Sequence, residues 1–241
     1  MTPLIELDEV TKVYAMGEVA VNAVAGISMT VEQGELLSIV GPSGSGKSTL
    51  MSILGCLDVP TSGRYLLDGD DVGHLSDNQL AELRGRKIGF IFQTYNLLPR
   101  LSALANVQLP LLYRGGKDGR QRSIAALEKV GLGNRLKHRP NELSGGEQQR
   151  VGIARALVKD PSIILADEPT GNLDTQSGND IMNILHQLRE DDGITVLIVT
   201  HDPEIAAATN RVVSMRDGAV VSDQTSGEFA RSRPAPLGGT P

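Results

Sequence analysis

A strand-like segment that leads straight into a glycine-rich loop and then into a helix constrains this fold more than any other feature. Leu36–Val40 is typical of a strand buried on both faces of a sheet. The loop Gly41–Thr49 follows it, and Lys47–Leu57 is predicted to be a helix. This order matches the phosphate-binding pattern G-x-x-x-x-G-K-[ST]. The alternative is a glycine-rich turn with a chance lysine, and the flanking strand and helix argue against it.

The residue types in this loop suit the binding of a nucleoside triphosphate. Glycines allow the backbone to curl so that its N–H groups face phosphate oxygens, and the positive end of the helix points at the same group. Lys47 supplies a full charge to the β- and γ-phosphates, and Ser48 offers a hydroxyl to Mg²⁺. We therefore predict ATP and Mg²⁺ as ligands. The expected contacts are Gly41, Pro42, Ser43, Gly44, Ser45, Gly46, Lys47, Ser48 and Thr49.

Two carboxylates follow a second apolar strand. Ile163–Ala166 leads into Asp167 and Glu168, and open α/β sheets bind ligands at the carboxyl ends of their strands. Asp167 is expected to hold the hydration shell of Mg²⁺, and Glu168 to polarise the attacking water as a general base. Taken alone, the pair resembles an ordinary acidic turn. Together with the phosphate-binding loop it predicts ATP hydrolysis.

The remaining pattern predicts an α/β fold with a mostly parallel sheet covered by helices, because strands and helices alternate along much of the chain. The predicted strands are Leu4–Val10, Ile27–Val31, Leu36–Val40, Arg64–Leu67, Ile88–Phe92, Ile163–Ala166, Ile194–Val199, Arg211–Met215 and Ala219–Val221. The further predicted helices are Asp77–Arg84, Ser102–Tyr113, Arg120–Val130 and a helix from Ser144 to about Lys159. We expect a P-loop NTPase fold with an antiparallel β portion near the N-terminus and an inserted α-helical lobe.

The absence of a strand pattern between about Gln93 and Lys159 places the helical lobe in the middle of the chain. We predict an ATP-binding core of residues 1–92 and 160–223, and a helical signature lobe of residues 93–159. Residues 224–241 end in a Pro- and Gly-rich sequence and are predicted to be a disordered tail.

Charge and cysteine content narrow the function classes. The net charge of −6 argues against nucleic acid as a partner, because phosphate-backbone binders usually carry a basic excess. The one cysteine, Cys56, excludes an intramolecular disulfide framework. No apolar run reaches the roughly 20 residues that a membrane-spanning helix needs. A protein of this kind that acts at a membrane therefore needs a partner to hold it there.

A third motif opens the helix after Leu143. Ser144 precedes Gly145 and Gly146 at the predicted helix N-terminus, which is the arrangement of a second anion-binding site. Glu147 stands three residues after Ser144, and the two can instead form a capping box. Both interpretations stay open on these residues alone.

Together these motifs resemble the ATPase subunits of ABC transporters, in the same order and over almost the whole chain. Leu143–Arg150 is similar to the signature motif of that family, which binds the γ-phosphate held by the opposite subunit. The resemblance implies a head-to-tail, ATP-dependent homodimer with two ATP molecules between the chains. It also implies nucleotide contacts from Leu143, Ser144, Gly145, Gly146 and Glu147.

Four further residues acquire roles only through this resemblance. Gln93 matches the switch glutamine that senses Mg²⁺ and water, and His201 matches the switch histidine that contacts the γ-phosphate. Asp174 ends a segment similar to the loop that crosses the dimer interface. Tyr14 stands where an aromatic residue stacks on adenine. A strand-edge tyrosine and a surface histidine are the ordinary alternatives.

Met51–Asp58, Phe92–Pro99 and Ala166–Asp174 are similar to the macrolide-exporter and lipoprotein-release group within the family. The resemblance implies an integral-membrane permease as partner. The permease is expected on a separate chain, because this one ends at Pro241 without a membrane segment. The ATPase is expected to be peripheral, at the cytoplasmic face of the inner membrane, and to drive export or extraction.

Two other interpretations compete with a transport ATPase. Soluble ABC proteins of DNA repair or translation normally carry two cassettes or a long coiled coil, and this chain has one cassette and no long heptad run. The ATPase of a division-type regulatory complex, which acts on cell-wall hydrolases through a membrane partner, looks much like this chain. It stays an alternative.

Overall fold

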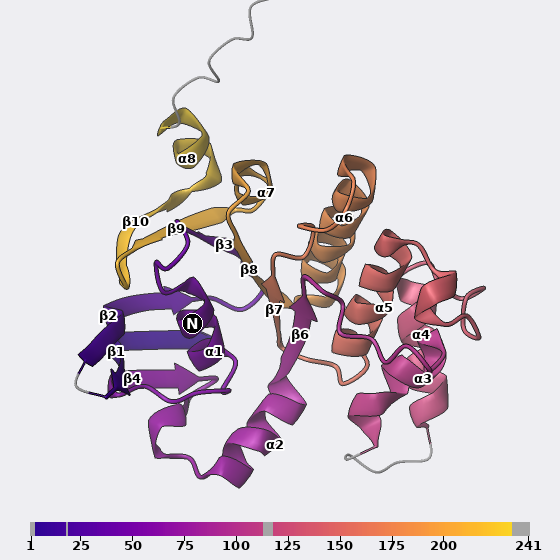
Figure 1. Cartoon of the computed structure of the whole chain (residues 1–241), viewed down its shortest axis with the longest axis horizontal. Coiled ribbons are helices and arrows are strands. Elements are labelled where there is room, and N and C mark those ends of the chain that lie inside the picture. Colours follow the sequence, from indigo (N-terminus) through magenta and orange to yellow (C-terminus); the bar gives the residue numbers. More distant parts are fainter. Residues whose placement is uncertain (1–2, 18, 113–117, 233–241) are drawn as a thin grey trace, which may run out of the picture.

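The protein is described by a computed structural model that covers residues 3–17, 19–112 and 118–232 (Figure 1). Its centre is a six-stranded sheet in which all neighbouring pairs are parallel except β9 and β10. In spatial order the strands are β10 (Ala219–Thr225), β9 (Arg211–Arg216), β3 (Leu36–Val40), β8 (Thr195–Thr200), β7 (Ile163–Asp167) and β6 (Ile88–Phe92). This confirms the predicted α/β class.

A second, antiparallel sheet of four strands packs beside the first. Its strands are β2 (Val19–Val31), β1 (Ile5–Met16), β4 (Ser62–Leu67) and β5 (Asp70–Asp71). The predicted strands Leu4–Val10 and Ile27–Val31 were too short, because β1 and β2 continue as one long hairpin. Register shifts interrupt this pairing, and bulges of this kind break the alternation that reveals a strand in sequence.

The helices cover both faces of the central sheet. They are α1 (Lys47–Leu54), α2 (Asp77–Lys87), α3 (Ala103–Gln108), α4 (Gly119–Lys129), α5 (Gly145–Leu157), α6 (Thr175–Asp192), α7 (Pro203–Ala207) and α8 (Ser226–Ser232). Three short 3₁₀ turns accompany them, at Val72–His74, Leu109–Leu111 and Pro140–Glu142. Figure 1 shows α3, α4 and α5 together on the side of the molecule away from the antiparallel sheet.

Two hydrophobic clusters lie on opposite faces of the central sheet. In β8, Leu197 and Val199 belong to a cluster with α1 and the antiparallel sheet. Val196 and Ile198 belong to a cluster with α3, α4, α5 and α6. This alternation follows from the two-residue period of a strand, whose successive side chains point to opposite faces. The sheet is therefore buried on both sides, as the apolar strands predicted.

Two predicted helices end earlier than expected. α1 stops at Leu54 rather than Leu57, because Cys56 has a left-handed backbone with φ 52°. The predicted helix Ser102–Tyr113 is wrong at its end: α3 stops at Gln108, and a 3₁₀ turn that contains Pro110 follows. Proline has no backbone N–H and cannot continue an α-helix ladder. Tyr113 lies outside the described residues.

The predicted disordered tail, residues 224–241, is wrong for its first part. Thr225 completes β10, and Ser226–Ser232 forms α8, which packs against α7. The helix starts with a capping arrangement, in which the Thr225 amide donates to Glu228 Oε2 (2.9 Å) and the Glu228 amide donates to Thr225 Oγ1 (3.3 Å). Residues 233–241 lie outside the described residues.

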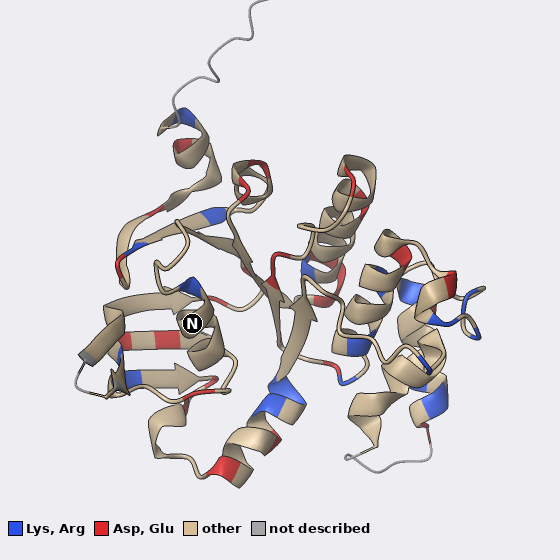
Figure 2. Cartoon of the chain, in the orientation of Figure 1, with Lys and Arg blue, Asp and Glu red and all other residues tan. Residues whose placement is uncertain are grey.

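Charged side chains of both signs are interspersed over the elements (Figure 2). In α2, Asp77 lies in the first turn and Arg84, Arg86 and Lys87 lie in the last. This placement complements the helix dipole, so it has a structural explanation and does not indicate a nucleic-acid surface.

Candidate active site

The phosphate-binding loop connects β3 to α1, and its glycines are required by the space around them. Gly46 is the N-cap of α1 with φ 95°, and a Cβ there would lie 2.3 Å from the Ala23 carbonyl oxygen. A Cβ on Gly41 would lie 2.3 Å from the carbonyl oxygen of Met215. Real Cβ atoms do not approach this closely, so both positions exclude any side chain. The neighbouring sheets therefore fix the curvature that the sequence motif predicted.

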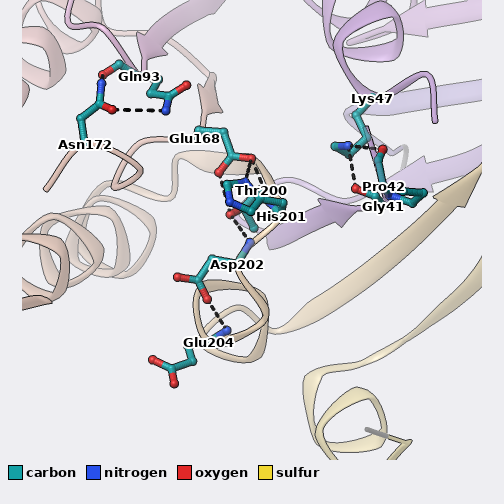
Figure 3. Close-up of polar contacts among 10 residues, drawn as sticks. All are labelled: Gly41, Pro42, Lys47, Gln93, Glu168, Asn172, Thr200, His201, Asp202 and Glu204. Atoms are coloured by element: carbon teal, nitrogen blue, oxygen red, sulfur yellow. Dashed lines mark hydrogen bonds and ion pairs between the residues drawn. The ribbon is translucent and has the colours of Figure 1, made fainter. Parts of the chain in front are cut away.

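Lys47 folds back over its own loop (Figure 3). Its Nζ donates to the carbonyl oxygens of Gly41 (2.7 Å) and Pro42 (2.9 Å). In the same loop, the buried Ser45 Oγ has no hydrogen-bond partner among the described residues. An ammonium group held by neutral carbonyls and a buried hydroxyl without a partner both suit an anionic ligand with oxygen atoms. This loop therefore fits the phosphates of a nucleotide.

The two carboxylates lie where β7 ends. Asp167 is the last residue of β7 and pairs in register with Val199 of β8 and Phe92 of β6. Burial raises the pKa of Asp167, the charge of Glu168 raises it further, and Lys47 opposes both effects. The carboxyl edge of the central sheet thus brings Asp167 and Glu168 into the electrostatic reach of the phosphate-binding loop.

Glu168 is held by three donors from the end of β8 and the turn after it (Figure 3). Thr200 Oγ1 donates to Oε2 (3.0 Å), and the amide of His201 donates to Oε1 (2.9 Å). His201 Nδ1 also lies 2.6 Å from Oε1. Glu168 itself has φ 45°, and its amide donates to the Val199 carbonyl (2.8 Å). A non-glycine residue in this conformation is uncommon, and these contacts hold it there.

The contact with Glu168 also determines which ring nitrogen of His201 faces the carboxylate. A carboxylate accepts only, so Nδ1 of His201 carries the proton and Nε2 is left for another partner. The His201 side chain is 74% exposed while that of Glu168 is 16% exposed. Thr200 is buried, and its Oγ1 also accepts from the Asp202 amide (3.0 Å). Thr200 could not be recognised from the sequence, since a threonine at a strand end matches no motif.

Gln93 is linked to the loop that follows Glu168 (Figure 3). Asn172 Nδ2 donates to the Gln93 carbonyl (3.0 Å), and Gln93 Nε2 lies 3.4 Å from Asn172 Oδ1. A Cβ on Gly171 would lie 2.9 Å from Gln93 Nε2, so the loop passes close to the amide. The structure therefore joins Gln93 to the segment that leads to Asp174. The sequence assigned Asn172 no role beyond its place in the segment that ends at Asp174.

The capping box at Ser144, one of the two sequence interpretations, is present. The Glu147 amide donates to Ser144 Oγ (3.2 Å), and the Ser144 amide donates to Glu147 Oε2 (2.9 Å). The Ser144 amide is the main cause of a lowered pKa at Glu147, and Arg135 lowers it further from 3.0 Å. Among the described residues, no hydrogen bond or ion pair joins Ser144–Glu147 to the phosphate-binding loop. Within one chain, the two motifs are not brought into contact.

The last two predicted site residues already have partners. The Tyr14 hydroxyl, on β1, donates to Asp58 Oδ2 (2.8 Å), and 38% of this tyrosine is exposed. Asp174 is the N-cap of α6: its Oδ1 accepts from the Ser177 amide (2.9 Å), which lowers its pKa. Leu143 is buried just before α5. A nucleotide role for each of these residues stays a prediction.

Over the described ranges, no three His, Cys, Asp or Glu side chains form a group that could hold a metal ion. Ser48, Gln93 and Asp167 offer one hydroxyl, one amide and one carboxylate. Mg²⁺ commonly takes one or two protein ligands and completes its shell with waters and substrate phosphates. These three residues therefore fit a metal that arrives with a nucleotide. Within the same ranges, no helix is both long and apolar enough to span a bilayer.

Comparisons with known proteins agree with this geometry. The family described as "ABC transporter" matches residues 24–171. The chain is 51% identical over 221 residues to the macrolide export ATP-binding/permease protein MacB of Syntrophobacter fumaroxidans, and the match covers 90% of this chain but 31% of that protein. It is 54% identical to an uncharacterized ABC transporter ATP-binding protein of Thermotoga maritima, over 91% of this chain and 94% of the relative.

A similar solved structure is also an ATP-binding cassette. The ATP-binding cassette MJ0796, determined as a dimer in a post-hydrolysis state bound to ADP and Pi, superposes with a TM-score of 0.84. It shares 45% sequence identity, and the match covers 92% of this chain and 98% of that one. Identity and coverage at this level extend the likeness from the fold to the sequence over nearly the whole chain.

Proposed function

The chain belongs to the ABC transporter ATP-binding family, and from this premise we propose that it hydrolyses ATP to drive a membrane permease on a separate chain. The observation that carries the proposal is the fixed carboxylate of Glu168, held by Thr200 and His201 at the sheet edge that also presents the phosphate-binding loop. The Thermotoga relative, of which the chain covers 94%, supports an ATPase subunit of this size.

In the proposed reaction, a water attacks the γ-phosphorus of ATP and Glu168 accepts a proton from that water. The bond between the γ-phosphorus and the β–γ bridging oxygen breaks, and ADP is the leaving group. His201 keeps Glu168 in place through Nδ1–H. It would donate to the γ-phosphate through Nε2 only when that nitrogen also carries a proton. The Lys47 ammonium group leaves the carbonyls of Gly41 and Pro42 and contacts the phosphates. There its positive charge stabilises the negative charge of the transition state.

Ser48, Asp167 and Gln93 are proposed to bind Mg²⁺ together with the nucleotide. The bound ion would neutralise charge on the β- and γ-phosphates. The raised pKa of Asp167 supports this assignment, because a half-buried carboxylate next to Glu168 gains most from a nearby cation.

We propose that the working unit is a head-to-tail homodimer. The N-terminus of α5, with Ser144, Gly145 and Gly146, would bind the γ-phosphate held by the other copy. The capping box occupies Ser144 Oγ but leaves the helix dipole directed at that end. The dimeric state of the solved relative supports this proposal. Asp174, next to the Gln93 contact, would lie at the interface.

The permease would hold this subunit at the cytoplasmic face of the inner membrane, and the direction would be export or extraction. Support comes from the macrolide-export relative, which combines an ATP-binding part and a permease in one protein. Phosphate release from ATP by the purified chain tests the enzyme, with Glu168→Gln as the control that should bind ATP without turning it over. Binding without turnover in the wild type would instead favour the division-type regulatory ATPase.

A further inference from the structure

Tyr14 belongs to a small polar cluster near the C-terminal end of β1, an inner strand of the antiparallel sheet. Its hydroxyl donates to Asp58 Oδ2 (2.8 Å), and Lys12 Nζ lies 5.1 Å from the centre of its ring. Lys12 also donates to Asp58 Oδ1 (2.5 Å) and to the carbonyl of Val59 (2.8 Å). Asp58 thus holds the tyrosine with one oxygen and the lysine with the other.

The backbone of Asp58 is held by the helix α1 as well. The Asp58 amide donates to the carbonyl of Ser52 (3.3 Å) in α1, and Ser52 Oγ donates to the carbonyl of Ser48 (2.9 Å). Asp58 therefore connects the Tyr14 hydroxyl to the same helix that presents the phosphate-binding loop at its other end.

Lys12 and Asp58 form an ion pair that is largely buried. The side chain of Lys12 is 12% exposed and that of Asp58 is 28% exposed. Burial acts to raise the pKa of Asp58, but the hydrogen bonds from Lys12, Tyr14 and the Val59 amide outweigh it and lower the pKa. Asp58 is thus ionised at neutral pH and available as an acceptor. An ionised acceptor makes a stronger hydrogen bond than a neutral one.

We propose that Asp58 is a positioning residue that fixes the ring of Tyr14 for stacking on the adenine of bound ATP, with Lys12 holding Asp58 in place. The inference rests on the adenine contact of Tyr14. A tyrosine side chain that must be immobilised on binding reduces affinity, and one that is already fixed does not. Because the Asp58 amide is bonded to α1, Asp58 would link the adenine contact of Tyr14 to the helix that follows the phosphate-binding loop.

The test is a double-mutant cycle on the full chain, read as the Kd for a non-hydrolysable ATP analogue and, separately, for inorganic tripolyphosphate. Asp58→Ala should weaken binding of the analogue by about three- to tenfold, the cost of one freed side chain, and leave tripolyphosphate binding unchanged. Tyr14→Phe keeps the ring but loses the hydroxyl, so adding Asp58→Ala to it should weaken binding no further. Asp58→Asn keeps an acceptor for the hydroxyl and should restore most of the affinity.

Additive losses in the double variant, or an equal loss for tripolyphosphate, would show that Asp58 does not act through Tyr14. Tyr14→Ala separates this failure from a failure of the adenine contact itself. If Tyr14→Ala binds the analogue as well as the wild type does, then Tyr14 does not contact adenine and Asp58 does not position it. If Asp58→Ala does not fold, the comparison of Asp58→Asn with Tyr14→Phe still decides, since a wild-type affinity in Tyr14→Phe also contradicts the proposal.

Discussion

Replacing Thr200 with valine removes one of the three donors that hold Glu168 while keeping the shape of a fully buried side chain. A hydrogen bond to a charged group contributes about 1.5–3 kcal/mol. The amide and Nδ1 of His201 continue to hold Oε1 of Glu168. We therefore expect the activation free energy of ATP hydrolysis to rise by the lower end of that range. About 1.4 kcal/mol corresponds to a roughly tenfold fall in kcat. The KM for ATP should barely change, because Thr200 does not line the phosphate-binding loop.

Thr200→Val should also reduce stability. Its Oγ1 accepts from the Asp202 amide at 3.0 Å, and an amide left without a partner costs about 1–3 kcal/mol when it is buried. Thr200→Ser keeps the hydroxyl and is the matched control. Steady-state phosphate release measures kcat, and thermal unfolding measures stability. A kcat within twofold of the wild type in Thr200→Val, or an equal loss in Thr200→Ser, would refute the positioning of Glu168 by this hydroxyl.

Three other substitutions probe the site and its surroundings. Asp167→Asn should raise the melting temperature of the nucleotide-free protein at pH 7, because the raised pKa of Asp167 means that its charged form opposes folding. The gain in melting temperature should vanish as the pH falls toward the ordinary aspartate pKa of about 3.9. A gain that does not change with pH would contradict this reasoning. Gly46→Ala should abolish ATP binding in equilibrium titrations, since its Cβ would lie 2.3 Å from the carbonyl of Ala23; micromolar binding would disprove the argument. Arg155→Lys should lower ATP turnover without changing nucleotide affinity. Arg155 donates to the carbonyls of Tyr95 (2.7 Å) and Asn96, two residues with left-handed backbones that follow Gln93 closely in the chain. Unchanged turnover would show that Arg155 does not position Gln93.

The parts of the fold that could be predicted were those where one local rule decides the outcome. The unit from Leu36 to the helix at Lys47 combines an apolar strand, a glycine loop and a helix. All three are present in the structure, and only the end of the helix differs. The long β1–β2 hairpin could not be read, because its exposed outer half is stabilised by cross-strand pairing rather than by an apolar face. The short helix α8 was hidden for a similar reason: none of its residues is buried.

The site shows the same limit. Glu168 and His201 were recognised from their motifs, but the contact between them depends on β7 and β8 being neighbours in the sheet. Thr200 belongs to no motif, and Asp58 only ends the segment Met51–Asp58 without a role of its own. Each becomes significant only through the atoms that it contacts. The capping box at Ser144 was readable from spacing, since both partners lie within one turn of a helix.

The central claim is that the site on one chain is completed by a second copy of the chain. Size-exclusion chromatography with light scattering on Glu168→Gln tests it most directly, with and without ATP and Mg²⁺. We expect a monomer without ATP and a dimer with it. When Ser144→Arg is added at the N-terminus of α5, we expect a monomer in both conditions. A Glu168→Gln protein that binds ATP and remains monomeric would contradict the account.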